Sequence, residues 1–299
     1  MSALLGAIET GGTKVVCVAA RDAATILAER RIATTTPAAT MGAAEDFFAT
    51  VSAEMGALSA IGIASFGPVD IRPFSPTYGH LLATPKPGWA NTDLISQFAK
   101  RFSCPVVLDT DVNAAALAEA MHGAGRGCGV VVYVTVGTGI GGGIVISGRP
   151  VHGALHPEMG HIRVLRHEHD RERPGVCAFH GDCLEGLASG SAIDARYGAP
   201  LDRLPAGHQA AEIVGYYLGQ LAATIVLMVS PERLVFGGGV MNDARVFTQL
   251  RSTAARFLNG YLPFAPGPRA LDELIVAPGL GEQSGVVGAI ALAEAARTL

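Results

Sequence analysis

Two aspartates and an asparagine stand where a buried apolar run gives way to an alanine-rich one. The segment reads Val107-Leu108-Asp109-Thr110-Asp111-Val112-Asn113, and its pattern predicts a strand over 106–108 and a helix over 112–121. Ligands of α/β proteins gather at the ends of such strands. Asp111 could therefore orient a sugar hydroxyl and accept its proton late in a phosphoryl transfer. The alternative is that Asp111 caps the helix, and the two roles are compatible.

Cys177, His180 and Cys183 form a C-x2-H-x2-C pattern in a loop flanked by glycines. With His161 upstream, the set could fill a closed tetrahedral zinc site. Such a site can contribute on the order of 10–16 kcal/mol of apparent binding free energy to a poorly packed loop. The alternative is a pair of buried thiols and two surface imidazoles. Other nearby histidines compete as ligands, namely His152, His156, His167 and His169. The remaining cysteines are interpreted as core residues, namely Cys17, Cys104 and Cys128.

Three glycine turns follow apolar, strand-like runs. They are Thr10-Gly11-Gly12-Thr13-Lys14, Gly137-Thr138-Gly139 and Gly237-Gly238-Gly239. Without a Cβ in the way, backbone N–H groups of such turns can approach an anion. A plain structural hairpin would explain any one turn, but three in one chain favour a nucleoside triphosphate. Neither P-loop spacing nor the glycine-rich loop of protein kinases fits these residues.

Alternation of apolar strand-like runs with helical patterns predicts an α/β protein with partly parallel sheets. The runs 4–8 and 15–20 form a glycine hairpin, and 130–136 with 140–146 repeats it, which indicates two similar halves. The other predicted strands cover 26–34, 61–65, 234–236 and 274–277. The other predicted helices cover 41–58, 93–102, 209–229, a segment after 239 and the chain from about 283, and a loop is expected over 150–182.

Composition limits the possible classes of protein. The chain has 299 residues, enough for two ordinary domains, and 49% are apolar while 16% are charged, which argues against disorder. A net charge of −4 argues against a dedicated nucleic-acid binder. The longest apolar run, Leu221–Val229, is half of the ~20 residues that a membrane span needs. Five cysteines do not make a disulfide framework. We expect a reduced, cytoplasmic protein without a membrane segment.

The chain resembles the ROK sugar kinases, and within them the bacterial fructokinase branch, over nearly its whole length. The shared segments are Glu9 to Lys14, Phe66-Gly67-Pro68, Thr84 to Trp89, Asp109 to Asn113, Val136 to Gly143, His156 to His161, Cys177 to Gly190 and Phe236 to Gly239. The E-x-G-H element followed by a Cys/His cluster is highly specific to that family.

This resemblance implies an actin-like ATPase (ribonuclease H-like) fold with two domains and a central cleft. The smaller domain would be 1–117 plus 284–299, and the larger one, with the zinc loop, 118–283. It implies ATP, Mg²⁺ and a structural Zn²⁺ as cofactors, a hexose as substrate, and a homodimer. Asp111 matches the catalytic base, and the sugar side would comprise Gly67, Pro68, Asn113, Glu158, His161 and Glu185. The three glycine turns, with Thr10, Thr13, Lys14 and Thr138, match phosphate and nucleotide contacts. The zinc ligands would be His161, Cys177, His180 and Cys183.

Two positions depart from the broader family pattern. Glu9 stands where many members have Asp, which leaves its reach to Mg²⁺ open. Thr110 stands where many glucose and amino-sugar kinases have Asn, which favours fructose, phosphorylated at O6. The alternatives are a mannokinase, glucokinase or N-acetylhexosamine kinase, a non-catalytic sugar sensor, and a sugar-responsive repressor. The last is disfavoured by the net charge and by a first phosphate turn that begins at Thr10.

Overall fold

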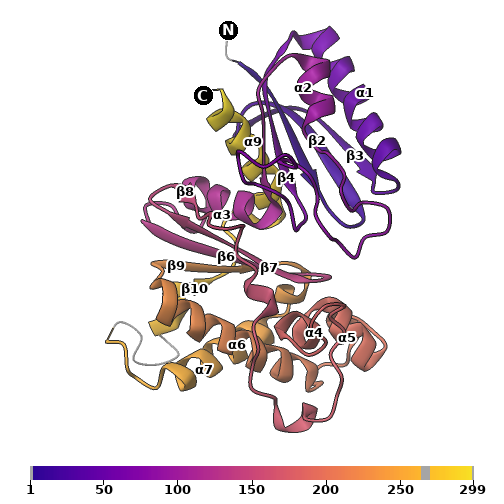
Figure 1. Ribbon diagram of the computed structural model, residues 1–299. Helices are drawn as coiled ribbons and strands as arrows, with labels where there is room; N and C mark the ends of the chain where they lie inside the picture. Colours follow the sequence, from indigo (N-terminus) through magenta and orange to yellow (C-terminus); the bar gives the residue numbers. More distant parts are fainter. Residues whose placement is uncertain (1–2, 264–269, 298–299) are drawn as a thin grey trace. The chain divides into compact units, whose positions relative to one another are not determined.

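The computed structural model describes residues 3–263 and 270–297, which form two compact units (Figure 1). Unit 1 contains the chain up to Ala118, the segment Pro150–His156 and the chain from Gln283; unit 2 contains Glu119–Arg149 and Pro157–Glu282. The expected domain boundaries, whose ends 1 and 299 lie outside the described residues, stay a prediction. Unit 1 also contains Pro150–His156, which the sequence analysis placed in the other domain.

Unit 1 is built on a five-stranded sheet of order β3-β2-β1-β4-β5. Its strands are β1 (Leu4–Thr10), β2 (Lys14–Asp22), β3 (Thr25–Ala33), β4 (Leu58–Ser65) and β5 (Val106–Thr110). β1 pairs antiparallel with β2 and parallel with β4, which in turn pairs parallel with β5. The predicted opening hairpin is therefore confirmed. Its inner strands are near-continuous buried apolar runs, as expected for strands covered on both faces.

The helices of unit 1 are α1 (Pro37–Met55), α2 (Ser96–Phe102), the first part of α3 (Asp111–His122) and α9 (Ser284–Ala296). α1 begins four residues before the predicted start, because Thr36 accepts a hydrogen bond from the Ala39 N–H and Pro37 occupies the first turn. α9 packs on β1 and β4. Both ends of the chain thus build the same unit.

Unit 2 repeats this plan with a sheet of order β10-β9-β6-β7-β8. Its strands are β6 (Val130–Val136), β7 (Ile140–Ile146), β8 (Arg149–Pro150), β9 (Arg233–Gly237) and β10 (Ile275–Val276). β6 pairs antiparallel with β7 and parallel with β9, as β1 does with β2 and β4. The same strand order in both sheets confirms the internal repeat.

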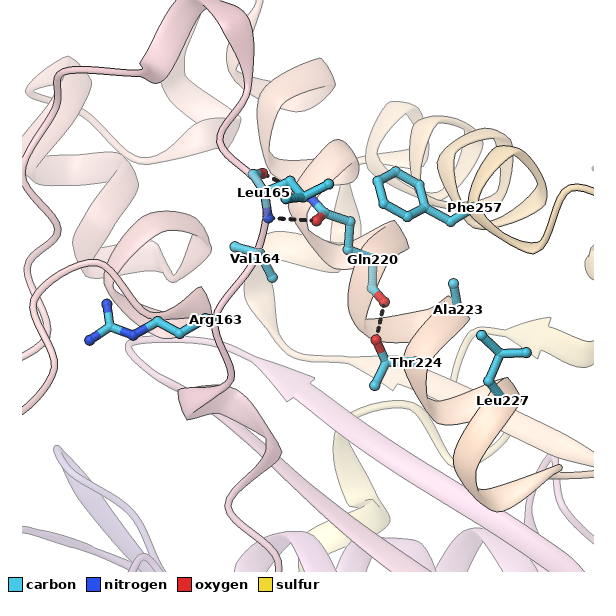
Figure 2. Close-up of a pocket in the computed structure, with 8 residues that line it drawn as sticks. All are labelled: Arg163, Val164, Leu165, Gln220, Ala223, Thr224, Leu227 and Phe257. Atoms are coloured by element: carbon cyan, nitrogen blue, oxygen red, sulfur yellow. Dashed lines mark hydrogen bonds between the residues drawn. The ribbon is translucent and has the colours of Figure 1, made fainter.

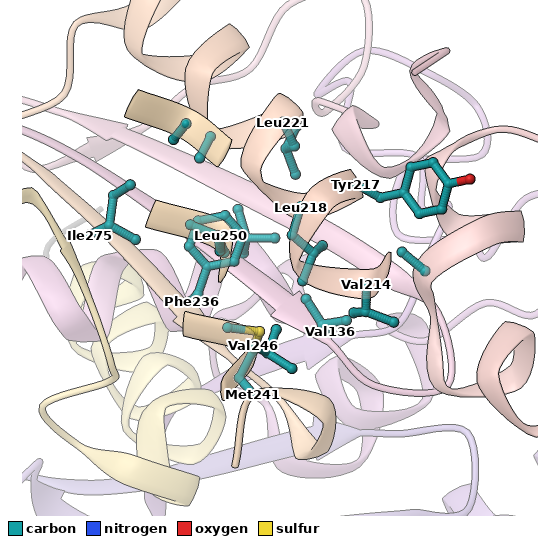
Figure 3. Close-up of a cluster of buried hydrophobic side chains, with 14 of the residues drawn as sticks. Val136, Val214, Tyr217, Leu218, Leu221, Phe236, Met241, Val246, Leu250 and Ile275 are labelled. Atoms are coloured by element: carbon teal, nitrogen blue, oxygen red, sulfur yellow. The ribbon is translucent and has the colours of Figure 1, made fainter. Parts of the chain in front are cut away.

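The helices of unit 2 are α4 (Leu184–Ala188), α5 (Gly190–Tyr197), α6 (Ala210–Val229), α7 (Ala244–Leu258) and α8 (Leu271–Leu274). Short 3₁₀ turns cover Met159–His161, Glu168–Asp170, Leu201–Arg203, Gly239–Asn242 and Gly281–Gln283. α6 and α7 pack on one another, and Leu218 of α6, Leu250 of α7 and Phe236 of β9 belong to one buried cluster (Figure 3).

α6 confirms the helix predicted over 209–229, but its apolar stretch is longer than the run Leu221–Val229 noted in the sequence. Its 20 residues have the length and hydropathy of a membrane-crossing helix. However, 67% of its apolar 18-residue stretch is buried inside the protein. Burial of this kind is typical of a core helix, and most residues of α6 belong to the core of unit 2.

Three other expectations differ from the structure. The sequence analysis did not predict α4 and α5, whose short lengths leave little periodicity to detect. The strand expected over 274–277 is shorter, because Leu274 ends α8. Of the three cysteines interpreted as core, only Cys17 is fully buried, while Cys104 and Cys128 are partly exposed. Burial raises the pKa of Cys17 to about 12, which keeps that thiol protonated and inert.

The predicted loop after β8 is largely irregular but is held by a buried ion pair. Asp170 Oδ2 accepts hydrogen bonds from Arg196 Nη2 and from the Tyr217 hydroxyl, both at 2.7 Å. The side chain of Asp170 is fully buried and that of Arg196 nearly so. Because α5 and α6 supply these partners, the loop that carries the Cys/His pattern is fixed to the helices of unit 2.

Candidate active site

Asp111 is the first residue of α3, directly after β5. The cap of this helix comes from Thr110, whose Oγ1 accepts a hydrogen bond from the Asn113 N–H at 3.1 Å. Asp111 Oδ1 accepts one from its own neighbour, the Val112 N–H, at 2.9 Å. The interpretation of Asp111 as the helix cap is therefore wrong, because the preceding threonine has that position.

Asp109 is the centre of a buried hydrogen-bond network that holds this motif. Its Oδ1 accepts from the Thr110 N–H and from Asn113 Nδ2, each at 2.7 Å, and its Oδ2 lies 2.8 Å from His152 Nε2. Asp109 is only 2% exposed. The hydrogen bond to Asp109 raises the pKa of His152, so the imidazolium is favoured. The network fixes Asn113 and the turn that carries Asp111.

Asn113 retains an unused acceptor. The residue is fully buried, and among the described residues its Oδ1 has no hydrogen-bond partner. A buried amide oxygen in this state needs a donor. A hydroxyl group of a ligand can supply one.

From the sequence alone, His152 is only a competing metal ligand and Asp109 has no assigned role. The structure assigns both to the network above. His156 also lies outside the Cys/His cluster, because its Nε2 accepts a hydrogen bond from the Val69 N–H at 3.2 Å. Asp109 was detectable as a second acidic residue at a buried strand end, but no sequence signal connected it to a histidine 43 residues away.

Gly67 and Pro68 follow β4, and the peptide bond between them is cis. Gly67 lies beside the His156 ring, since a Cβ placed on it would be 3.5 Å from His156 Cε1. These residues belong to unit 1, as do Asp111 and Asn113.

The first glycine turn joins β1 to β2, and some of its polar groups form hydrogen bonds within the protein. The Gly11 N–H donates to Lys14 O at 2.9 Å, and the Thr10 hydroxyl is buried and donates to Ser65 Oγ at 2.9 Å. Gly12, Thr13 and Lys14 are exposed. The accessible polar groups of this turn therefore belong to its last three residues.

Glu9 is the partly buried next-to-last residue of β1, just before this turn. Burial raises the pKa of its carboxyl, whereas Lys14 and Arg31 act in the opposite direction. A ligand for Mg²⁺ must be ionised. The burial of Glu9 thus opposes the ionised carboxylate that Mg²⁺ needs, and its two basic neighbours favour that ionised form.

The second glycine turn joins β6 to β7 and contacts the two helices that the sequence analysis did not predict. The Gly190 N–H, at the start of α5, donates to Gly137 O at 2.7 Å, and the Ser191 N–H donates to Thr138 O at 3.5 Å. Glu185 in α4 accepts a hydrogen bond from the Ile140 N–H at 3.0 Å. The carboxylate of Glu185 is thereby fixed beside the turn.

Gly237, Gly238 and Gly239 lie where β9 ends and a 3₁₀ turn begins. Gly238 has a φ of 91°, which L-residues rarely adopt. The strand-to-helix position that the sequence analysis expected for this glycine run is confirmed.

Glu158, His161 and Glu185 lie close together in unit 2. His161 Nε2 is 3.9 Å from Glu158 Oε2. Burial, and secondarily the charge of Glu185, raises the pKa of Glu158 to about 7. A pair of carboxyl groups beside an imidazole offers hydrogen-bond acceptors of the kind that bind sugar hydroxyls.

The four predicted zinc ligands meet in one cluster. One ligand atom from each of His161, Cys177, His180 and Cys183 lies within 4.8 Å of all the others. His161 Nδ1 is 3.5 Å from Cys183 Sγ and 3.7 Å from Cys177 Sγ. Bond lengths of about 2.3 Å to sulfur and 2.0 Å to nitrogen in a tetrahedron place ligand atoms roughly 3.5 Å apart. The donor set and its spacing therefore fit a zinc ion.

A separate hollow of about 280 Å³ lies on unit 2, and Figure 2 shows the residues that line it, several of them from α6. Gln220 exchanges hydrogen bonds with the backbone of Leu165 there, and Leu227 and Phe257 add apolar surface. None of the predicted site residues lines this hollow. We therefore do not assign it to the candidate active site.

The ROK family profile matches residues 5–296. The fructokinase of Zymomonas mobilis is 46% identical over 296 residues, which cover 98% of this chain and 97% of that protein. The fructokinase of Pediococcus pentosaceus is 38% identical over 293 residues and 98% of each chain. The chain belongs to the ROK family.

Solved structures agree with this assignment. A ROK hexokinase from Thermus thermophilus has a TM-score of 0.78 and 27% identity, with 98% of each chain covered. A ROK glucokinase from Streptomyces griseus, solved with glucose and AMPPNP, has a TM-score of 0.72 and 26% identity, covering 98% of this chain and 99% of that one. The fold is the actin-like ATPase fold of sugar kinases.

Proposed function

We propose that this protein is an ATP-dependent fructokinase that forms fructose 6-phosphate. The observation that carries the proposal is the 46% identity to a fructokinase along nearly the whole of both chains. Thr110 stands where many glucose and amino-sugar kinases of the family have Asn, which favours fructose over glucose.

Asp111 is the proposed base. Its carboxylate orients the attacking hydroxyl by accepting its hydrogen bond. The hydroxyl oxygen forms a bond to the γ-phosphorus while the bond to the β–γ bridging oxygen breaks, and ADP leaves with that oxygen. The proton passes to Asp111 once the new bond is advanced, because a free carboxylate with a pKa of ~3.9 holds it poorly in the ground state.

The other predicted site residues hold the two substrates. Gly67, Pro68 and Asn113 are proposed sugar contacts, and Glu158, His161 and Glu185 are proposed acceptors for sugar hydroxyls. The nucleotide would be held by the glycine turns, comprising Thr10, Gly11, Gly12, Thr13, Lys14, Gly137, Thr138, Gly139, Gly237, Gly238 and Gly239. Mg²⁺, when bound, neutralises charge on the ATP phosphates.

Zinc has a structural role in this proposal. The four protein ligands His161, Cys177, His180 and Cys183 would complete its coordination and leave no open position for catalysis. Zinc would fix His161 next to Glu158 and hold Cys183 two residues before Glu185. The metal would thus position the sugar acceptors of unit 2. A cytoplasmic location and a homodimer complete the proposal.

The test is turnover of purified protein with ATP, followed by ADP release over fructose, glucose, mannose and N-acetylmannosamine. We expect fructose to have the highest kcat/KM. Asp111→Asn should lower kcat at least ~10²-fold, the contribution of a general base. Near-normal turnover of the variant would refute the role of Asp111, and absence of turnover on every sugar would favour a sugar sensor.

A further inference from the structure

Lysine is rare in this chain, and two of its three lysines lie at the first glycine turn. Of the 22 basic residues, 19 are arginine; the lysines are Lys14, Lys86 and Lys100. Lys14 is the last residue of the turn. Lys86 comes from the loop between β4 and α2, 74 residues away from its partner Gly12, whose carbonyl oxygen accepts a hydrogen bond from Lys86 Nζ.

A tight turn and a buried tryptophan fix the position of Lys86. The Trp89 N–H donates to Lys86 O at 3.3 Å. Pro87 and Gly88 are the central residues, and Gly88 has a φ of 77°, as a type II turn requires. Trp89 is fully buried, its Nε1 donates to Thr35 O at 2.8 Å, and its ring meets Phe66 edge-on at 5.5 Å. The indole thus anchors the turn that presents Lys86.

The carbonyl groups of the glycine turn all have donors. Thr34 Oγ1 donates to Gly11 O at 2.8 Å, the Thr34 N–H donates to Thr13 O at 3.0 Å, and Lys86 Nζ donates to Gly12 O. Carbonyl oxygens repel an anion, whereas N–H groups and ammonium groups attract it. With its carbonyls bonded within the protein, the turn is suited to an anionic group, and Lys86 adds a positive charge.

We propose that Lys86 is a phosphate-binding residue that contacts the phosphoryl group transferred from ATP. The proposal rests on the kinase function above and adds a residue to its site. An ammonium group has three N–H donors, and Gly12 O takes one of them. The remaining two can bind phosphate oxygens, where fixed positive charge stabilises phosphoryl transfer.

Substitution of Lys86 tests the proposal once turnover of the wild type is measured. Lys86→Met should lower kcat at least tenfold and leave the KM for fructose within about twofold, since losing one transition-state donor costs about 10²–10³ in kcat. Lys86→Arg should restore part of the loss because it keeps the charge. Lys100→Met, at an exposed residue of α2, is the matched control and should behave as the wild type.

Binding measurements separate a phosphate contact from a purely structural role. Lys86→Met should weaken binding of AMPPNP at least tenfold more than binding of ADP. A kcat within twofold of the wild type, or equal losses for the two nucleotides, would overturn the proposal. The latter result would mean that Lys86 only supports the turn through Gly12.

Amine labelling of the unmodified protein provides a test that needs no variant. Reductive methylation, followed by peptide mass spectrometry, reports each lysine separately. AMPPNP should slow labelling of Lys86 relative to ADP and leave Lys100 unchanged. Equal labelling of Lys86 with both nucleotides would contradict the contact. This experiment remains informative even if no sugar is phosphorylated, so it distinguishes failure of this inference from failure of the proposed function.

Discussion

The glycine turns of the two units have the same place in equivalent hairpins but differ in their surroundings. Gly11 to Thr13, in unit 1, receives the ammonium of Lys86 and the hydroxyl of Thr34. Gly137 to Gly139, in unit 2, lies beside the carboxylate of Glu185 and receives backbone N–H groups from α5. A glycine turn therefore allows a ligand to come close to the backbone. The side chains that lie next to the turn in the fold determine the local charge.

The two units also differ in how they hold their proposed sugar contacts. In unit 1 the motif around Asp111 depends on hydrogen bonds to one buried carboxylate, Asp109. In unit 2 the residues Glu158 and Glu185 flank a cluster that fits a metal ion. Removing the metal, substituting a glycine of either turn or changing the pH should consequently affect the two units differently.

Removal of the metal should have the largest effect. The wild type should contain one zinc per chain by elemental analysis, and Cys183→Ser should contain none. Because structural zinc contributes roughly 10–16 kcal/mol, we expect Tm to fall by about 10 °C or more. Chelation of the wild type should lower Tm and fructose affinity together.

Cys128→Ser is the matched control for this prediction, since Cys128 also belongs to unit 2 but lies outside the cluster. It should retain zinc and Tm. A wild type that is fully active without stoichiometric zinc would remove the metal from the proposed function.

Alanine at equivalent turns should separate the two substrates. At Gly139 a Cβ would lie 2.6 Å from Glu185 Oε2, so the carboxylate must move, whereas at Gly12 it would meet nothing within 4 Å. Through displacement of Glu185, Gly139→Ala should raise the KM for fructose about tenfold, as expected for losing a hydrogen bond to a charged group, in addition to any loss of its proposed nucleotide contact. Gly12→Ala should change the free energy of unfolding by less than about 0.5 kcal/mol and raise the KM for ATP. If both variants changed the KM for fructose and the KM for ATP equally, the proposed difference between the two turns would be contradicted.

The smallest expected effect is a pH dependence confined to unit 1. The hydrogen bond to Asp109 raises the folded-state pKa of His152 above its ordinary 6.5. The contribution of protonated His152 to the free energy of unfolding is therefore complete below about pH 6.5. It is lost as pH rises through the pKa of His152 in the folded state. Denaturant unfolding should show stability falling over that range in the wild type. His152→Gln, which cannot titrate, should lack this slope; an unchanged slope would show that another group causes it.

Local patterns were sufficient to predict much of the fold and part of the site. Period-two and helical spacing gave the hairpins, α3 and α6, and the close spacing of Cys177, His180 and Cys183 gave the candidate metal cluster. Helices α4 and α5 were missed because they are short. The roles of Asp109 and His152 were missed because hydrogen bonds between distant residues leave no local pattern.

The sequence by itself determined which residues can accept a proton, hold a metal or allow close backbone approach, because these are properties of residue type and short spacing. Only the tertiary structure decided which partners they have. Lys86 meets Gly12 across 74 positions, His152 meets Asp109 across 43, and Glu185 meets Ile140 across 45. Such contacts depend on the pairing of strands and the packing of helices, and these are cooperative properties of the whole chain.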